Sequence, residues 1–205
     1  DSLPSKFVLK SNLQANSSAV MIISDKSNTD FKEIRSKLKS WLKPWNTLLN
    51  SWDYRFYNST PQILAEEFMQ DESGELRDYK FFCFNGHVPY FRVDYGRSNK
   101  HHACFFNEEY KELDISVPDF PKEDGVKIDL PDTIAEMHKL ARQLSEGFPF
   151  IRIDFFSCNN KIYLSEFTFA PGGGVTHYPD MFNKELGELF HLPKHGQSHI
   201  HIVLH

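Results

Sequence analysis

Two neighbouring apolar segments constrain the fold of this chain more than any other feature: Phe150–Phe156 (FIRIDFF) and Ile162–Phe169 (IYLSEFTF). Both are rich in β-branched and aromatic residues, which favour strands, and the polar residues Cys158-Asn159-Asn160 lie between them. The pattern therefore predicts a hairpin of two largely buried strands.

Polar side chains interrupt both predicted strands at matched positions. Arg152 and Asp154 share one face of the first strand, and Glu166 and Thr168 share one face of the second, because alternate side chains of a strand point the same way. A loop of three or five residues would place Asp154 opposite Glu166 and Arg152 opposite Thr168. A loop of two or four residues would instead put the two pairs on opposite faces.

Asp154 and Glu166 are candidate metal ligands. Two carboxylates about 5 Å apart on a buried sheet repel each other, so they need a compensating cation. Oxygen ligands from one or two carboxylates and from nucleotide phosphates are what Mg²⁺ prefers. The alternative is that Arg152 neutralises both carboxylates in a purely structural network.

Five further residues are candidates for binding. Lys10 ends an apolar strand just before a polar loop, from which an ammonium group could reach phosphates. Glu66 and Glu67 are adjacent within a predicted strand, so they point to opposite faces and one of them is expected to be partly buried. Asp78 and Lys80 share a face of the next strand, where a simple ion pair is an equally good interpretation.

The remaining patterns predict a mixture of strands and helices. The dipeptide Asn85-Gly86 is the strongest hairpin signal. Helices are expected where apolar residues recur at helical spacing, and strands where short apolar runs occur. The expected hairpin strands are 6–10 with 19–24 and 76–84 with 88–94; a further strand covers 63–69, and the helices cover about 31–43, 131–146 and 180–190.

Composition excludes several classes of protein. The net charge of −5 gives no general attraction to nucleic acid or to an anionic membrane, and no apolar run reaches the roughly 18 residues of a membrane span. The three cysteines are too widely spaced for a disulfide framework or a zinc site and are expected to be reduced. His101, His102 and the terminal histidines are expected to be solvated, and the protein is expected to be cytosolic.

Seven segments follow one another in a characteristic order: KFVLK, the helix ending in Trp41-Leu42-Lys43, ILAEEFM, GELRDYKFFCFNG, LSEGFPFIRIDFF, IYLSEFTFAPGGG and LGELF. In this order they resemble the TupA-like ATP-grasp family over about residues 3–192. The family is associated with building bacterial surface polymers, including teichuronopeptide, and its members are frequently labelled glycosyltransferases.

The resemblance implies an α+β fold of the ATP-grasp kind, in which two lobes with antiparallel sheets and flanking helices enclose a nucleotide. It places a small lobe at residues 1–62 and a larger lobe with the metal site at residues 63–192. A loosely ordered tail is expected at 193–205.

The resemblance also implies roles for the candidate residues. Lys10 would bind the phosphates of ATP, Glu66 and Glu67 would lie at the adenine and ribose, and Asp78 and Lys80 would line the site beside the triphosphate.

In the same way, the resemblance implies that Asp154 and Glu166 coordinate Mg²⁺. Arg152 would lie near the transferred phosphate, and Thr168 occupies a position where many ATP-grasp enzymes have Asn.

The implied activity is an ATP- and Mg²⁺-dependent carboxylate–amine ligase in surface-polysaccharide biosynthesis. Its substrates would be a uronic-acid-containing saccharide and an amino acid, and an association with membrane-bound polysaccharide assembly is left open. One alternative is a glycosyltransferase that uses Asp154 and Glu166 to hold the metal of a sugar nucleotide. Another is a degenerate nucleotide-binding module, because the loop Ser11–Ser18 has no glycine and the family's N-terminal subdomain is not expected here.

Overall fold

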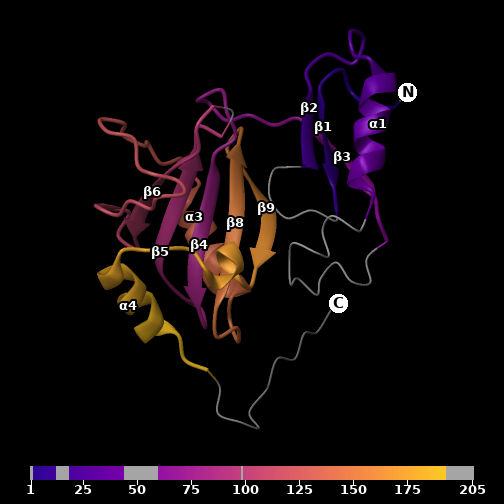
Figure 1. The fold of residues 1–205 in the computed structure, drawn as a ribbon. Coiled ribbons are helices and arrows are strands. Elements are labelled where there is room, and N and C mark those ends of the chain that lie inside the picture. The colour runs from indigo at the N-terminus through magenta and orange to yellow at the C-terminus, as the bar shows by residue number, and fades with distance from the viewer. Residues whose placement is uncertain (1, 13–18, 44–59, 98, 193–205) are drawn as a thin grey trace. The chain divides into compact units, whose positions relative to one another are not determined.

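The computed structural model describes residues 2–12, 19–43, 60–97 and 99–192. The chain divides into two compact units, Asp1–Phe68 and Met69–His205, and each unit is built on its own antiparallel sheet (Figure 1). The fold is therefore α+β, as the sequence predicts. The glycine-free part of the loop after Asn12 and the expected tail at 193–205 lie outside the described residues.

The first unit contains a three-stranded sheet in the order β2-β1-β3 with one helix against it. Strand β1 alternates between buried and half-buried side chains, so that Phe7 and Leu9 face the core while Lys10 lies on the other face. The elements are β1 (Phe7–Ser11), β2 (Val20–Ile23), α1 (Phe31–Trp41) and β3 (Ile63–Glu67).

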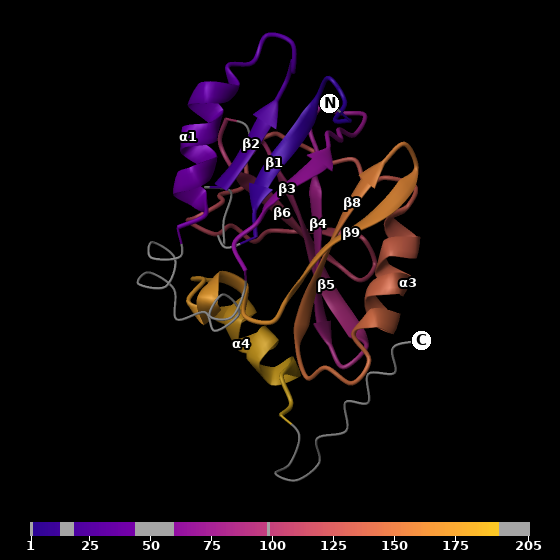
Figure 2. The same ribbon diagram turned by 90° about the vertical axis from the view of Figure 1, so that its right-hand side faces the viewer.

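Helix α1 closes the core of this unit (Figure 2). It begins after Asp30, whose side chain accepts a hydrogen bond of 2.8 Å from the backbone N–H of Lys32 and so satisfies a free donor of the first turn. Ile34 and Leu38 lie one turn apart and pack with Phe7. Strand β3 pairs with β1, and the compact unit runs to Phe68, whereas the small lobe expected from the sequence ends at residue 62.

The second unit contains a six-stranded sheet in the order β7-β6-β5-β4-β8-β9, and all its neighbouring strands are antiparallel. Its strands are β4 (Asp78–Phe84), β5 (His87–Tyr95), β6 (His102–Asn107), β7 (Glu112–Leu113), β8 (Ile151–Cys158) and β9 (Lys161–Thr168). Its α-helices are α3 (Ile134–Leu144) and α4 (Asp180–Leu189).

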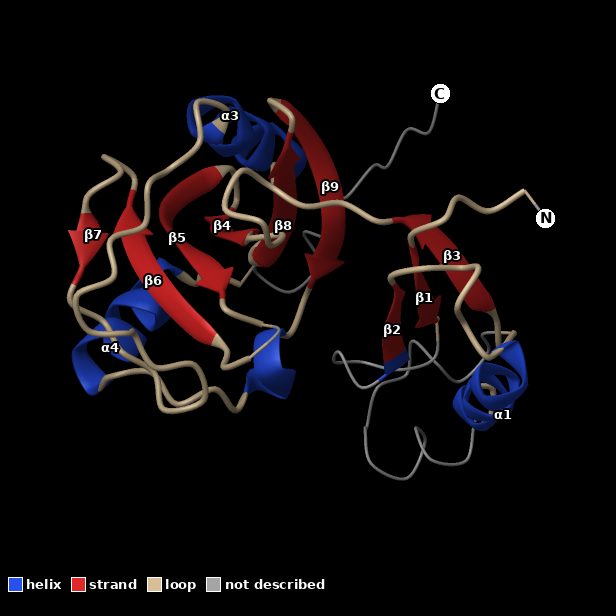
Figure 3. Cartoon of the chain, turned by 90° about the horizontal axis from the view of Figure 1, so that it is seen from above, coloured by secondary structure: helices blue, strands red, loops and turns tan. Residues whose placement is uncertain are grey.

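Helices α3 and α4 cover opposite faces of this sheet (Figure 3). On the α3 face, Phe81 and Ile153 pack with Met137 in a core of fully buried side chains. On the α4 face, Phe105 packs with Phe182 in a second, smaller core. Strand β4 is buried along its whole length because both of its faces are covered.

The predicted hairpin at Asn85-Gly86 is confirmed. Both residues have positive φ, 49° and 82°, which a two-residue type I′ turn requires. The register then shifts between the pairs Phe84↔His87 and Phe82↔Tyr90, so β5 has one extra residue next to the turn.

In the hairpin β8–β9, the loop length that the sequence leaves open is two residues. The turn is Asn159–Asn160. Such a turn alone would separate the polar pairs, but a β-bulge shifts the register between Phe155 and Asp154. Asp154 therefore still pairs with Glu166 on one face of the sheet.

The three cysteines are free and buried, as predicted. Burial raises the pKa of the Cys83 thiol to about 12, so this group behaves as a small core side chain. Among the described residues, no helix has both the length and the apolar character needed to cross a membrane.

Candidate functional site

The face of the large sheet that packs on α4 carries a row of charged and polar side chains across β5, β4, β8 and β9, and all of them except Glu166 are buried. On this face, Lys80 lies opposite Arg92 of β5 and Asp154 of β8, and Asp78 lies opposite Asp94. We call this row the polar band; its members are Asp78, Lys80, Arg92, Asp94, Arg152, Asp154, Glu166 and Thr168.

Lys80 lies at the centre of the polar band and is 5% exposed. Its ammonium nitrogen is 2.6 Å from Asp154 Oδ2, 3.0 Å from Asp78 Oδ2 and 4.0 Å from Asp94 Oδ2. A single buried cation thus links carboxylates from three strands. Removing a charged group from water is costly, and this arrangement offsets the cost only while all the partners remain in place.

Arg152 links β8 to β9. Its Nε donates to Asp154 Oδ1 at 2.7 Å and its Nη2 to Asp154 Oδ2 at 2.7 Å, which is the bidentate geometry of a strong ion pair. The same Nη2 lies 3.2 Å from Glu166 Oε1 and 3.1 Å from Thr168 Oγ1. Burial alone would lower the pKa of Arg152, but the hydrogen bonds and charges of these carboxylates raise it. The predicted set Arg152, Asp154, Glu166 and Thr168 is thus brought together.

Arg92 and Asp94 of the polar band, and His101 beside them, are not predicted as site residues from the sequence. Arg92 Nε is 2.8 Å from Asp94 Oδ1, and His101 Nε2 is 3.1 Å from Asp94 Oδ2. Burial opposes ionisation of Asp94, but the contact with His101 and the charges of Arg92 and Lys80 outweigh it and lower its pKa to about 2. Asp94 is therefore a permanent anion at neutral pH.

The prediction that His101 and His102 are solvated is wrong. His102 is 8% exposed and stacks on Tyr95, while the half-buried ring of His101 lies against Phe120. His102 is the first residue of β6 and His101 immediately precedes it, and each ring packs against an aromatic neighbour. Arg92 lies over the same Phe120 ring, 4.0 Å from its centre, which fixes the guanidinium within the polar band.

The oxygen atoms of the polar band fit a magnesium ion only in part. Asp154 uses both of its oxygens for Lys80 and Arg152, whereas Glu166 is 57% exposed and Asp78 Oδ1 is buried without a hydrogen-bond partner among the described residues. Carboxylates retain free lone pairs in such contacts. Within the described ranges no three Asp, Glu, His or Cys side chains form a complete metal cage, so an ion here would need phosphate and water ligands as well.

In the first unit, Lys10 and Glu66 form an ion pair on the face of the small sheet opposite α1. Their side chains are 34% and 42% exposed. Apolar side chains on the same face surround the pair, including Ile22 and Leu64, which are 54% and 44% exposed. Glu66 and Glu67 both lie on the edge strand β3 and count as exposed, although an exposure of 42% leaves the Glu66 side chain partly covered. They do lie on opposite faces, as predicted.

The sequence of the chain matches a known protein family over nearly its whole length. The chain is an ATP-grasp protein, since a sequence model described as TupA-like ATPgrasp matches residues 1–191. The chain therefore belongs to the TupA-like ATP-grasp family, which confirms the resemblance seen in its sequence. No curated protein matches it.

Solved structures that match include D-alanine–D-alanine ligases. The enzyme from Helicobacter pylori is 20% identical with a TM-score of 0.49, and the match covers 94% of this chain and 51% of that one. The Bacillus anthracis enzyme is 16% identical with a TM-score of 0.44, and the match covers 90% of this chain and 53% of that one. Its complex with ATP is 15% identical with a TM-score of 0.43, and the match covers 90% of this chain and 52% of that one. The chain thus spans about half the length of the solved structures it matches.

Proposed function

We propose that this chain is the nucleotide-binding part of an ATP-dependent carboxylate–amine ligase. The polar band is the observation that carries the proposal. Three cations, Lys80, Arg92 and Arg152, are held almost completely buried by carboxylates on a face whose other side chains are apolar. Preorganised cations of this kind stabilise the charge that develops when a phosphoryl group moves.

The proposed roles follow from the positions of the cations. Lys80 and Arg152 face the same surface of the sheet, and we assign them to the triphosphate and to the transferred phosphoryl group, with Asp78 and Thr168 setting their orientation. Lys10 is assigned to the phosphates. Its ion pair with Glu66 is exposed enough for Lys10 to exchange partners when an anion arrives.

Glu66 and Glu67 remain proposed contacts of the ribose and adenine. The two side chains are adjacent on β3 and point to opposite faces, so only Glu66 shares a face with Lys10. The apolar side chains around this pair suit contact with a flat base.

Asp154 and Glu166 are the proposed magnesium ligands. Glu166 has the more exposed carboxylate, and its pairing with Asp154 sets two hard oxygen donors side by side. A bound Mg²⁺ would supply positive charge next to the phosphate oxygens.

The proposed reaction needs no nucleophile from the protein. An oxygen of the acceptor carboxylate attacks the γ-phosphorus of ATP, the bond to the β-phosphate oxygen breaks, and ADP leaves with the bonding electron pair. The products of this step are ADP and an acyl phosphate. The amine then attacks the acyl carbon, inorganic phosphate departs, and the amine loses a proton as the amide forms. Lys80 and Arg152 offset the negative charge during the first step.

The substrates are proposed by class. The family's association with surface polymers supports a uronic-acid-containing saccharide as the carboxylate and an amino acid as the amine. The proposed reaction takes place in the cytoplasm and is a step of bacterial surface-polysaccharide biosynthesis.

Thermal unfolding with added nucleotides tests the proposal. A ligand at 100 times its dissociation constant should stabilise the folded chain by about 2.7 kcal/mol. We expect Mg²⁺ with ATP to raise Tm, and we expect Asp154→Asn and Glu166→Gln to abolish the shift. Glu188→Gln, on the exposed surface of α4, also removes one carboxylate, so it is the matched control and should retain the shift. A shift with a UDP-sugar but not with ATP would favour a glycosyltransferase, and the absence of any shift would indicate a degenerate module.

A further inference from the structure

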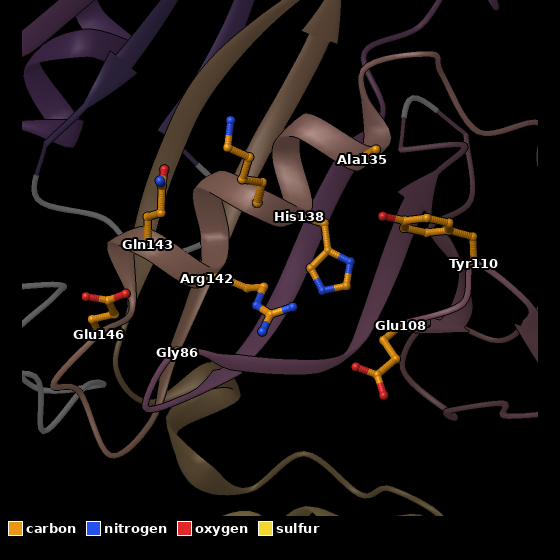
Figure 4. A pocket seen from close by; sticks show the side chains of 9 residues that line it. Gly86, Glu108, Tyr110, Ala135, His138, Arg142, Gln143 and Glu146 are labelled. Carbon is orange, nitrogen blue, oxygen red and sulfur yellow. The ribbon is translucent and has the colours of Figure 1, made fainter.

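A pocket of about 480 Å³ lies on the α3 face of the second unit, on the opposite side of the sheet from the polar band. One wall is a single surface of α3, formed by side chains at helical spacing that include His138 and Arg142. The other wall comes from the β4–β5 turn at Gly86 and from the turn after β6, which supplies Glu108 and Tyr110 (Figure 4). Its volume falls within the range of small-molecule sites.

His138 forms the buried floor of the pocket and is 6% exposed. Burial lowers its pKa, opposed by a hydrogen bond to the backbone of Val88. The ring is therefore neutral at neutral pH, and a neutral imidazole bonded through one nitrogen keeps a lone pair on the other. Its ring packs between Phe81 and Tyr110 at centroid distances of 5.8 Å each.

Tyr110 adopts a backbone conformation that bulky residues rarely accept, with φ at 62°. The position belongs to a tight turn in which the Asn107 side chain accepts hydrogen bonds from the N–H groups of Glu109 and Lys111. Glycine would suit this position better. The tyrosine instead places its ring edge-on against His138 and Phe91 and so forms a wall of the pocket.

Charges of both signs line the pocket without neutralising each other. Within the described part of the chain, the side chains of Arg142 and Glu146 make no ion pair, although both border the pocket. Glu108 lies 3.7 Å from His87, which is not part of the pocket lining. In the close view, the guanidinium of Arg142 extends toward His138 and Glu108 (Figure 4). A ligand with one negative and one positive group would satisfy both kinds of charge.

We infer that this pocket binds a small zwitterion of the amino-acid class. The ligand carboxylate bonds to Arg142, which can hold it through two parallel hydrogen bonds. The ligand ammonium group bonds to Glu108 and to the lone pair of His138. The site is separate from the nucleotide chemistry, because the polar band lies on the other face of the sheet.

NMR of the full chain labelled with ¹⁵N tests the inference through the His138 ring nitrogens and the Tyr110 amide. The probes are a pool of the common L-amino acids, each amino acid alone, and acetate, inorganic phosphate and methylammonium as single-charge controls. We expect saturable shifts at both residues with at least one amino acid and weaker or no response to the controls.

Variants locate the binding. Arg142→Gln removes the guanidinium at an exposed helical position and should weaken binding by about tenfold or more, and Glu108→Gln should weaken it in the same direction. Lys184→Gln on α4 removes the same charge outside the pocket and should bind as the unaltered chain does. No saturable shift with any amino acid, an equal response to acetate or phosphate, or unchanged binding by Arg142→Gln would each overturn the inference.

Discussion

The polar band of the second unit and the Lys10–Glu66 pair of the first unit place opposite charges on one face of an antiparallel sheet, but in different surroundings. In the band, Asp94 and Asp154 are completely buried and share cations with neighbouring strands. In the small sheet, Lys10 and Glu66 are about one third to two fifths exposed and pair only with each other in the contacts described above.

This difference in burial predicts which substitutions change the stability of the fold and which change only ligand binding. A buried charge left without its partner is costly, so the members of the polar band depend on one another for folding as well as for any chemistry. An exposed ion pair contributes little to stability because water screens it. Substitutions in the band should therefore disturb both properties, whereas substitutions at Lys10 should affect ligand binding alone.

The largest effect is expected from Asp154→Ala. The substitution leaves Lys80 and Arg152 buried without their shared partner, and breaking a buried pair in this way costs about 3–5 kcal/mol. Urea unfolding would measure the loss. Glu188→Ala, in the exposed pair with Lys184 on α4, is the control and should cost less than about 1 kcal/mol. A similar small loss for Asp154→Ala would show that the band is solvated and not mutually dependent.

The next effect is the dependence of stability on pH through Asp94. Its pKa is lowered from 3.8 to about 2 in the folded chain. The resulting stabilisation is fully present above about pH 4 and is lost as the pH falls toward 2, because the unfolded state then binds the proton first. The contribution is about 2 kcal/mol.

Unfolding curves of the unaltered chain and of Asp94→Asn, recorded between about pH 5 and pH 2.5, would show this dependence. The variant should lose less stability on acidification than the unaltered chain, by about 2 kcal/mol. Parallel curves would mean that Asp94 is not held ionised by its neighbours.

The sequence predicts the elements of the polar band better than it predicts their register. The alternation of polar and apolar residues showed that Asp78 and Lys80 share a face of one strand, Arg152 and Asp154 a face of a second, and Glu166 and Thr168 a face of a third. The structure brings the three pairs together on one face of the sheet. This succeeds because side-chain direction in a strand has a period of two, which a sequence displays directly.

The turns alone would have given the wrong pairing in both hairpins. Each is closed by a two-residue turn, and in each a one-residue shift then moves the charges into alignment. In β5 the extra residue lies beside Pro89, which has no N–H to donate to the ladder and is tolerated at such a position. The shift in β9 has no comparable marker in the sequence.

Arg92, Asp94 and His101 could not be assigned to the site from local pattern. The alternation of Arg92 with Asp94 shows only that they share a face of one strand. Arg92 and Asp94 belong to the polar band because β5 lies beside β4 with a shifted register. His101 lies next to the band because it contacts Asp94. The available signal was the spacing Arg-x-Asp, which occurs on β5 at Arg92 and on β8 at Arg152.

A smaller effect on stability is expected for Lys10→Met. The exposed pair with Glu66 should be worth less than about 1 kcal/mol, so the urea midpoint should barely move. If Lys10 binds phosphates as proposed, the rise in Tm produced by Mg²⁺ with ATP should disappear. Lys32→Met, on the exposed surface of α1, is the matched control and should keep the rise. Retention of the full rise by Lys10→Met would remove Lys10 from the site.

The smallest effect should separate the adjacent residues Glu66 and Glu67. Both are exposed on an edge strand, so changing either to Gln should alter the free energy of unfolding by less than about 0.5 kcal/mol. Only Glu66 lies on the face of Lys10. Glu66→Gln should therefore weaken ATP binding, measured by calorimetry, several times more than Glu67→Gln does. Equal weakening by both substitutions would mean that the ligand contacts the end of β3 from both sides, and that the face of the sheet does not decide which carboxylate binds.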